Sequence, residues 1–526
     1  MTQYALPTLG DVVKILFDIT GVLPRTKENQ KGPTGFAEEQ KKTIQTRLQR
    51  LTKEQGELQP NVEKLFTLLA ECLEPYIRCP VRERQLTGLI NDLYGLYVSL
   101  VTTQGTLMSK RDSIRFLLVT YLADEGTRSL TKEWLKYLGF VVQPIRPSDP
   151  FWFLPTTEAG RQVSPLSKVL YWAYDSCGQT LVNFHRQPSS EGQDPKPNEW
   201  QNEKTARNWH QGRHIPYLGN LLQNLKESFE VQEAVDNPID KPLQDAIITH
   251  AALARMVTMA TSIISQAYGQ DFLDELCEQI RLYASWMNEE LEGFYREYEE
   301  QLGQIGPDPD HDAQVLLGLK MAPHFWKFFE TKRQSSTEIL RHHISPAGEP
   351  DPLIVNWNES RYGSYVSQVP VDTVSRWRQP PSVGIVPLIE RGLSMRKDPE
   401  LRPATIDALE EDLNRAEVAE RLTWLLHWLR GVVCYRAEDY ASAATHYQQA
   451  FDAAKYTAGE YQYLLVNQYI EVMAKTRQWR PFKKGVLWAC YLGVSVRWLR
   501  EDKPTADNLK GVYELMGMKQ INYPVL

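Results

Sequence analysis

The stretch that decides the expected fold is Glu203-Lys-Thr-Ala-Arg-Asn-Trp-His-Gln-Gly-Arg-His-Ile-Pro-Tyr-Leu-Gly-Asn-Leu-Leu-Gln-Asn-Leu225. Its first half is basic and favours a short helix, while Gly212 and Pro216 predict a break followed by a turn. The leucines after Pro216 recur at helical spacing and predict a second helix. The stretch therefore predicts two consecutive helices, of which the first is basic and bears Trp209.

The same order of features occurs three times along the chain. Each time a threonine begins a short helix, a proline lies in the following turn and a leucine lies in the next helix: Thr43, Pro60 and Leu65; Thr205, Pro216 and Leu221; Thr373, Pro380 and Leu388. The threonines are 162 residues (205 − 43) and 168 residues (373 − 205) apart. A period of this length predicts duplicated domains and not a short solenoid repeat. The alternative is chance similarity between helices of one all-α protein.

The fold predicted from these patterns is mainly α, with three tandem helical segments related by internal duplication and a C-terminal region that is similar to a helical repeat. The predicted domains are residues 1–155, 156–305, 306–400 and 401–526. The first boundary is predicted from Pro147, Pro150 and Pro155, and the second from the turn-rich residues 306–312. Residues 504–526 are predicted to form a short tail.

Composition limits the classes of function. The net charge of −7 and the isoelectric point near 5.9 argue against a protein that coats nucleic acid with its whole surface. The six cysteines are scattered without a C-x-x-C pair, so free thiols are expected and neither a disulfide framework nor a zinc site. No secretory signal and no apolar run of about 18 residues is present. A cytoplasmic protein without a membrane segment is therefore expected.

The Thr205 unit resembles a helix-turn-helix of the lambda-repressor type, in which a similar run covers the recognition helix and its exit. The matching positions are Thr205, Trp209, Gly212, Pro216 and Leu221, within the range Thr205–Leu225. The units at Thr43 and Thr373 repeat the pattern with departures, since Arg47 replaces the tryptophan in one and Gly is missing from the turn of the other. The resemblance implies that such units contact double-stranded DNA.

Candidate DNA-contacting residues follow from this resemblance and from the clustering of basic side chains. In the second unit they are Arg207, Asn208, His210, Gln211 and Arg213, with Trp209 expected to pack inward. In the first unit they are Lys41, Lys42, Arg47, Arg50 and Lys53, and in the third Arg376, Arg378, Arg391, Arg396 and Lys397. The alternative for all three is a solvated basic face on a structural helix.

Residues Trp428 to Phe451 resemble a single tetratricopeptide repeat. Gly431, Ala443, Tyr447 and Ala450 stand at the spacing at which that repeat places small residues and an aromatic one between two helices. The resemblance implies a surface for a protein partner. Two antiparallel helices in an ordinary core are an equal alternative.

Motifs for catalysis are absent: the sequence contains no phosphate-binding P-loop, nucleophile elbow, H-E-x-x-H or dinucleotide fingerprint. The most metal-like cluster, Asp308, Asp310, His311 and Asp312, is also typical of an ordinary loop. No cofactor, no metal site and no catalytic residue are therefore predicted.

These features predict a DNA-binding or DNA-associated adaptor or regulator with a helical surface for a partner protein. One alternative is a non-catalytic scaffold subunit of a larger nucleic-acid-handling or defence complex, without DNA contact of its own. Another is an enzyme whose site is assembled from distant residues and shows no local motif.

Overall fold

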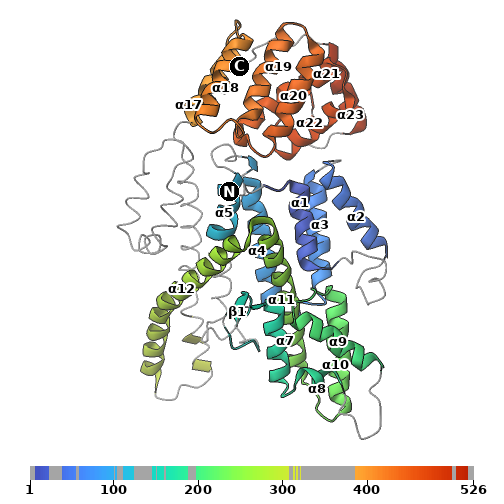
Figure 1. Cartoon of the computed structure of the whole chain (residues 1–526), viewed down its shortest axis with the longest axis vertical. Coiled ribbons are helices and arrows are strands. Elements are labelled where there is room, and N and C mark those ends of the chain that lie inside the picture. Colours follow the sequence, from blue (N-terminus) through green and yellow to red (C-terminus); the bar gives the residue numbers. More distant parts are fainter. Residues whose placement is uncertain are drawn as a thin grey trace.

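The computed structural model of the protein is mainly α, as predicted (Figure 1). It describes residues 6–22, 38–54, 58–99, 101–102, 110–123, 145–149, 151–158, 161–186, 197–306, 312–313, 316–317, 320, 385–499 and 505–518.

The chain before residue 306 forms two sets of helices joined by a small hairpin. The first set is α1 (Leu9–Thr20), α2 (Glu38–Thr52), α3 (Leu58–Leu73), α4 (Pro80–Ser99), α5 (Lys110–Arg115) and the π-helix η3 (Phe116–Leu122). The second is α7 (Pro165–Ser176), α8 (Leu181–His185), α9 (Pro197–His210), α10 (Leu218–Ala234), α11 (Lys241–Tyr268) and α12 (Gln270–Ile305). Between them, β1 (Thr156–Glu158) pairs antiparallel with β2 (Arg161–Val163), with Thr156 opposite Val163.

The central element of this part is α11. It packs on α1, α7, α10 and α12, so it joins the first set of helices to the second. Its residues from Ile247 to Met256 are almost all buried. Among the described helices it is also the one that is long and apolar enough to cross a membrane, and 56% of its most apolar stretch is buried inside the protein. A core helix passes the same test.

The first helix begins and ends at residues whose chemistry favours helix ends. The hydroxyl of Thr8 accepts a hydrogen bond from the backbone N–H of Asp11 at 3.2 Å, and the Asp11 carboxylate accepts one from the Thr8 N–H in return, which forms a capping box. Gly21 ends the helix in the left-handed conformation, with φ +64°. The guanidinium of Arg255 occupies the place where a side chain at Gly21 would project. Arg255 also donates to the carbonyl of Pro216 at 2.7 Å and to that of Ile19.

The two sets of helices follow the same order. Helices α1 and α7 both pack on α11, while α2 packs on α1 and α9 packs on α7. Helix α3 begins at Leu58 and α10 begins 160 residues later (218 − 58), at Leu218. With this shift, seven of the eight buried positions of α3 fall on buried positions of α10: Leu58/Leu218, Asn61/Leu221, Val62/Leu222, Leu65/Leu225, Leu68/Ser228, Leu69/Phe229 and Cys72/Gln232.

The C-terminal array, defined here as helices α17 to α23, lies at the top of Figure 1. Its elements are α17 (Ile385–Lys397), α18 (Pro403–Arg415), α19 (Thr423–Arg436), α20 (Tyr440–Ala454), η4 (Gly459–Tyr461), α21 (Gln462–Lys475), α22 (Trp479–Tyr491) and α23 (Ala506–Met518). Helices α19 and α20 lie close together because Gly431 has no side chain. A Cβ at this position would stand only 2.8 Å from Cδ2 of Tyr447. Ala443, Tyr447 and Ala450 are fully buried between them.

Two predictions of the C-terminal organisation are wrong. The boundary at residue 400 falls between α17 and α18, which pack on each other and on α19, so α17 belongs to the C-terminal array. The predicted tail contains α23, which packs on α21 and α22 and whose residues Leu509, Val512, Tyr513 and Met516 are buried. The third predicted segment lies mostly outside the described residues, as do Thr373, Pro380 and the metal-like residues Asp308, Asp310 and His311.

Candidate nucleic-acid interface

Helix α2 lies on the surface with a basic face. Ile44 and Leu51 are buried, and Leu48 is half-buried beside them. Lys42, Thr46, Gln49 and Lys53 are exposed at positions i, i+4, i+7 and i+11, with Arg50 next to them. From Lys42 to Lys53 the helix contains no carboxylate, and Lys42, Arg50 and Lys53 form no ion pair with any described residue. The result is a cationic face bordered by neutral hydroxyl and amide groups.

Helix α9 presents a similar face in the second set of helices. Its two carboxylates, Glu199 and Glu203, are 6% and 7% exposed. The exposed side is therefore made of neutral and basic side chains: Trp200, Gln201, Lys204, Arg207 and, just beyond the helix, Gln211 and Arg213. Because the acidic groups are turned inward, the outer side of the helix is cationic.

Two of the side chains on this face have partners within α9. The Nζ of Lys204 lies 4.9 Å from the ring centroid of Trp200, which is 49% exposed, so a cation and an aromatic face stand together on the surface. Arg207 pairs with Glu203, and Arg186 holds the other oxygen of the same carboxylate at 3.0 Å. Burial alone would raise the pKa of Glu203, but its hydrogen bonds and charge pairing with the two arginines lower it. Arg207 is thus held in place, whereas Lys204 projects over the tryptophan.

The inner side of α9 fixes the helix to the core. Trp209 is 2% exposed, which confirms that it packs inward, and its Nε1 donates to Nε2 of His214 at 2.7 Å. The carbonyl of His210 accepts a hydrogen bond from the Ser167 hydroxyl of α7 at 2.5 Å. Outside the helix, Nη1 of Arg213 donates to Oδ1 of Asn208 at 3.2 Å. The exposed face is therefore carried on a helix with little freedom to move.

The connections around α9 are longer than those of a compact helix-turn-helix. Helix α8 ends at His185 and α9 begins at Pro197, so residues 186–196 separate them, whereas the turn of that motif has about 3–4 residues. After α9, the carbonyl of Pro216 is bound by Arg255, and the N–H of Leu218 donates to the carbonyl of Gly21 at 3.2 Å. The turn after α9 is thus attached to α1 and α11.

The remaining residues that were predicted to contact DNA do not share one surface. Arg47 is half-buried and donates to Oδ1 of Asn61 at 2.8 Å. Arg391 pairs with Asp412 at 2.5 Å, far along the chain in the C-terminal array. Of the other predicted residues, Lys397 is exposed on α17, only the backbone of Lys41 is described, and Arg376 and Arg378 lie outside the described residues.

The prediction for Arg396 is wrong. Its side chain is among the largest fully buried ones, and its guanidinium carbon lies 5.0 Å from the centroid of the Trp428 ring. A buried guanidinium on an indole face contributes to the core of the C-terminal array and cannot reach a phosphate.

Two functional candidates, Trp200 and Lys204, were not among the predicted residues. The signal for Lys204 was available, because Lys42 precedes Thr43 as Lys204 precedes Thr205. Gln49 likewise lies six residues after Thr43 (49 − 43), and Gln211 lies six residues after Thr205 (211 − 205). The pairing of Trp200 with Lys204 at i and i+4 is also visible in the sequence once the helix is known.

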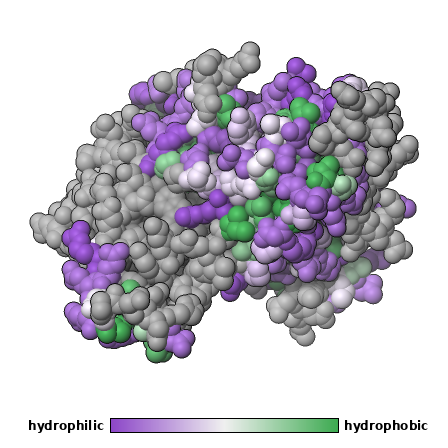
Figure 2. Space-filling view, turned by 90° about the horizontal axis from the view of Figure 1, so that it is seen from below, coloured by the Kyte–Doolittle hydropathy of each residue, from purple (hydrophilic) through white to green (hydrophobic). Residues whose placement is uncertain are grey.

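The surface at the end of the molecule that carries α7 to α10 is mostly hydrophilic among the described residues (Figure 2). Its hydrophobic patches are small and separate from one another. The described part of this end therefore presents no broad apolar surface.

No catalytic arrangement is found among the described side chains. His185 lies 2.5 Å from Oγ of Ser228 and 3.2 Å from the Tyr174 hydroxyl, but it is 1% exposed, and burial lowers its pKa to about 3. A neutral histidine sealed in the core supports structure and is not accessible to substrate. The described residues contain no cluster of histidine, cysteine or carboxylate side chains able to hold a metal ion, and all six cysteines are free.

Comparison with known proteins found no match for this chain among protein-family models, curated proteins or solved structures.

Proposed function

We propose that this protein is a DNA-associated adaptor that holds the phosphate backbone of a duplex with α2 and α9, and a partner protein with its C-terminal array. The observation that carries the proposal is the carboxylate-free basic face of α2 from Lys42 to Lys53 in a chain whose net charge is −7. Exposed lysine and arginine side chains release counterions from phosphates and supply affinity without sequence choice.

The matching face of α9 supports the same proposal. Lys42 and Lys204 occupy the same place relative to the repeated threonine, and the residues after the two threonines, Ile44 and Ala206, are both fully buried. The two helices thus turn equivalent sides outward. In α9 the Trp200 ring adds a flat apolar surface beside the cation.

The adaptor part of the proposal concerns the C-terminal array. Described side chains of this region that are both apolar and exposed include Leu464, Trp479, Leu515 and Met518. Exposed aromatic and aliphatic groups are typical of protein-binding surfaces. A pure scaffold without DNA contact is the competing function, and the experiment below separates the two.

The test is DNA binding as a function of salt, measured by fluorescence anisotropy with a labelled duplex of mixed sequence. The binding constant of the unaltered protein should fall steeply between about 50 and 200 mM salt. A variant with Lys42→Glu, Arg50→Glu and Lys53→Glu should bind about ten-fold more weakly or worse. The slope of log K against log salt should become shallower by roughly 0.9 for each phosphate that the variant no longer neutralises.

The matched control reverses three exposed cations of the C-terminal array: Arg480→Glu, Lys483→Glu and Lys510→Glu. Its net charge equals that of the α2 variant, so it should bind DNA nearly as the unaltered protein does. Equal weakening in the two variants would show that only overall charge matters, and no binding by the unaltered protein would leave the scaffold function. Lys204→Glu with Arg213→Glu tests α9 in the same assay and spares Arg207, which pairs with Glu203.

A further inference from the structure

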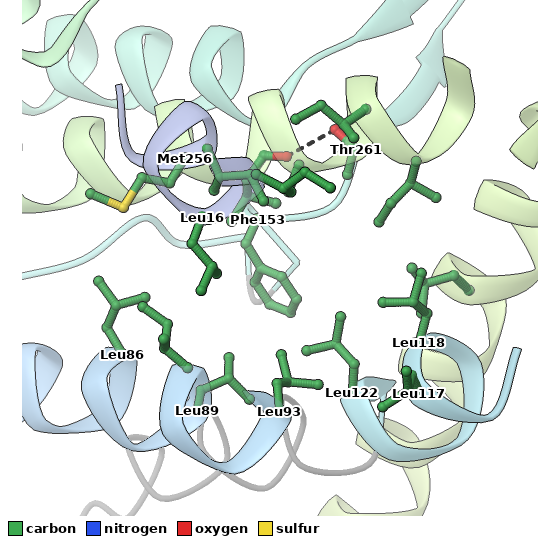
Figure 3. A pocket seen from close by; sticks show the side chains of 18 of the residues that line it. Leu16, Leu86, Leu89, Leu93, Leu117, Leu118, Leu122, Phe153, Met256 and Thr261 are labelled. Atoms are coloured by element: carbon green, nitrogen blue, oxygen red, sulfur yellow. Dashed lines mark hydrogen bonds between the residues drawn. The ribbon is translucent and has the colours of Figure 1, made fainter. Parts of the chain in front are cut away.

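A large apolar cavity lies between the two sets of helices. Its volume is about 440 Å³, and its walls come from α1, α4, η3, α11, α12 and the segment Trp152–Leu154. In Figure 3, leucines of α4 and of η3 border the space from two directions, and Leu16 of α1 and Met256 of α11 border it from a third. The Phe153 ring projects into the space between them.

The hydroxyl groups on the wall are used by the protein itself. Thr20 donates to the carbonyl of Phe17 at 2.9 Å, and Thr261 donates to that of Val257 at 2.9 Å. Tyr97 donates to the carbonyl of Pro7 at 2.5 Å. Because water in a cavity needs several polar partners, a space whose walls are so largely apolar favours an apolar occupant over most of its length.

The cavity extends along most of α4. This helix lines it from Arg82 to Tyr97, which corresponds to about 22 Å at the rise of an α-helix. A long hydrocarbon chain can follow a wall of this length.

One end of the α4 wall is positively charged. Nη2 of Arg82 lies 3.3 Å from Nε2 of His250, and Nδ1 of His250 lies 2.8 Å from the carbonyl of Ala246. His250 therefore donates from Nδ1 and accepts from Arg82 at Nε2. Burial lowers the pKa of Arg82 to about 10, assisted by the nearby charge of Arg146, so Arg82 is still a cation at neutral pH.

We propose that this cavity binds a long-chain fatty acid, with the hydrocarbon chain along α4 and the carboxylate beside Arg82. A guanidinium has five N–H donors in a planar fork that matches a carboxylate, so Arg82 can bind a carboxylate in addition to its partners within the protein, of which His250 is one. The bound chain would fill the space between α1 and α4 on one side and α11 and α12 on the other, and would stabilise the packing of the two sets of helices.

The experiment is titration of the full chain with cis-parinaric acid, a fluorescent long-chain fatty acid, followed by displacement with palmitate or with hexadecanol. Saturable binding with one site per chain is expected. Palmitate should displace the probe at a concentration at least ten-fold lower than hexadecanol, because both have the same chain and only palmitate has a charge for Arg82. No saturable binding would overturn the proposal, and equal displacement by the two would overturn the place of the carboxylate.

A cavity-filling variant and its control locate the site. Leu89→Trp adds an indole to the α4 wall and should lower the affinity for the probe at least ten-fold. Leu464→Trp makes the same change at a leucine of α21 that is 48% exposed and should leave the affinity unchanged. Equal affinity of the two variants would place the bound probe elsewhere. Displacement from the unaltered protein gives a result even if Leu89→Trp does not fold.

Discussion

Replacement of Glu54 by glutamine should weaken the attachment of the N-terminal helices to the C-terminal array. Glu54 follows α2 in the left-handed conformation, with φ +50°, which is unusual for a residue other than glycine. Its carboxylate accepts hydrogen bonds from Lys455, from Lys484 at 2.9 Å and from the Tyr456 hydroxyl at 2.9 Å. One side chain thus binds three groups of the C-terminal array.

The loss of unfolding free energy expected in Glu54→Gln follows from the burial of Lys455. The Lys455 side chain is 3% exposed, and its Nζ lies 4.6 Å from the ring centroid of Phe451. Removal of one partner from a buried ion pair costs about 3–5 kcal/mol, because the other charge is left in the interior. Asp452 still reaches Lys455 at 3.5 Å and Lys484 at 3.3 Å. We therefore expect the lower end, about 3 kcal/mol of unfolding free energy.

The assay is urea-induced unfolding followed by tryptophan fluorescence, with Glu514→Gln as the control. Glu514 pairs with Arg477 at 2.6 Å, but the two side chains are 44% and 50% exposed, so this control should lose less than about 1 kcal/mol. The chemical change is identical and only the burial differs. If Glu54→Gln loses no more free energy than Glu514→Gln, the argument from burial is refuted.

The unfolding free energy lost in Glu54→Gln should depend on pH, and the sign of that dependence follows from the pKa of Glu54. Burial alone would raise the pKa of Glu54, but the charges and hydrogen bonds of Lys455 and Lys484 lower it overall. The stabilisation by the Glu54 carboxylate is therefore complete at pH values above the usual pKa of glutamate, and it is lost as the pH falls through the lowered pKa of Glu54. The difference between the unaltered protein and Glu54→Gln should shrink over that range, because a protonated Glu54 is as neutral as glutamine.

Two further predictions concern the core. Gly21→Ala should lower the unfolding free energy by more than about 2 kcal/mol, because a Cβ would overlap the guanidinium of Arg255 and the left-handed backbone adds about 1–2 kcal/mol. The control is Gly178→Ala, at φ +62° with open space around it. In urea unfolding this control should lose only the free energy of the left-handed backbone. Burial lowers the pKa of His185 and of His250 to about 3, so both are neutral in the folded protein at pH values where they are charged after unfolding. Unfolding free energy should therefore fall as the pH drops from about 6.5 toward 3, by about 1.4 kcal/mol per pH unit for each histidine, and His185→Gln should remove its share of that slope in the same assay.

The helices were largely predictable because their apolar residues recur at helical spacing. The end of α1 at Gly21 is an example, since a glycine after a periodic segment favours a left-handed cap. The hairpin of β1 and β2 was not predictable, because strands of three residues are too short to show an alternating pattern. The packing of α23 on the C-terminal array depends on contacts with distant residues, which no local pattern reports.

The basic faces were predictable as clusters of charge, but the accessibility of each member was not. Arg396 resembles the other arginines in sequence, yet it is buried on Trp428, a partner that is distant in the chain. Arg207 is exposed but shares Glu203 with Arg186, and only the i,i+4 half of that arrangement is visible from spacing. Charge patterns thus indicate which helix faces are basic, whereas the fold decides which cations can reach a ligand.

The attachment of α9 decides how its face would be used. In a compact helix-turn-helix, a short turn sets the angle of the recognition helix. Here that role falls to buried contacts: Trp209 is packed inward and bonded to His214, and Arg255 links the turn after α9 to the end of α1. Since α1 and α7 share α11 as their support, α2 and α9 would keep a fixed separation when both contact one duplex. Under the proposed function, a rigid pair of basic helices would lose little entropy on binding, so that two modest faces would together hold a duplex that neither would hold alone.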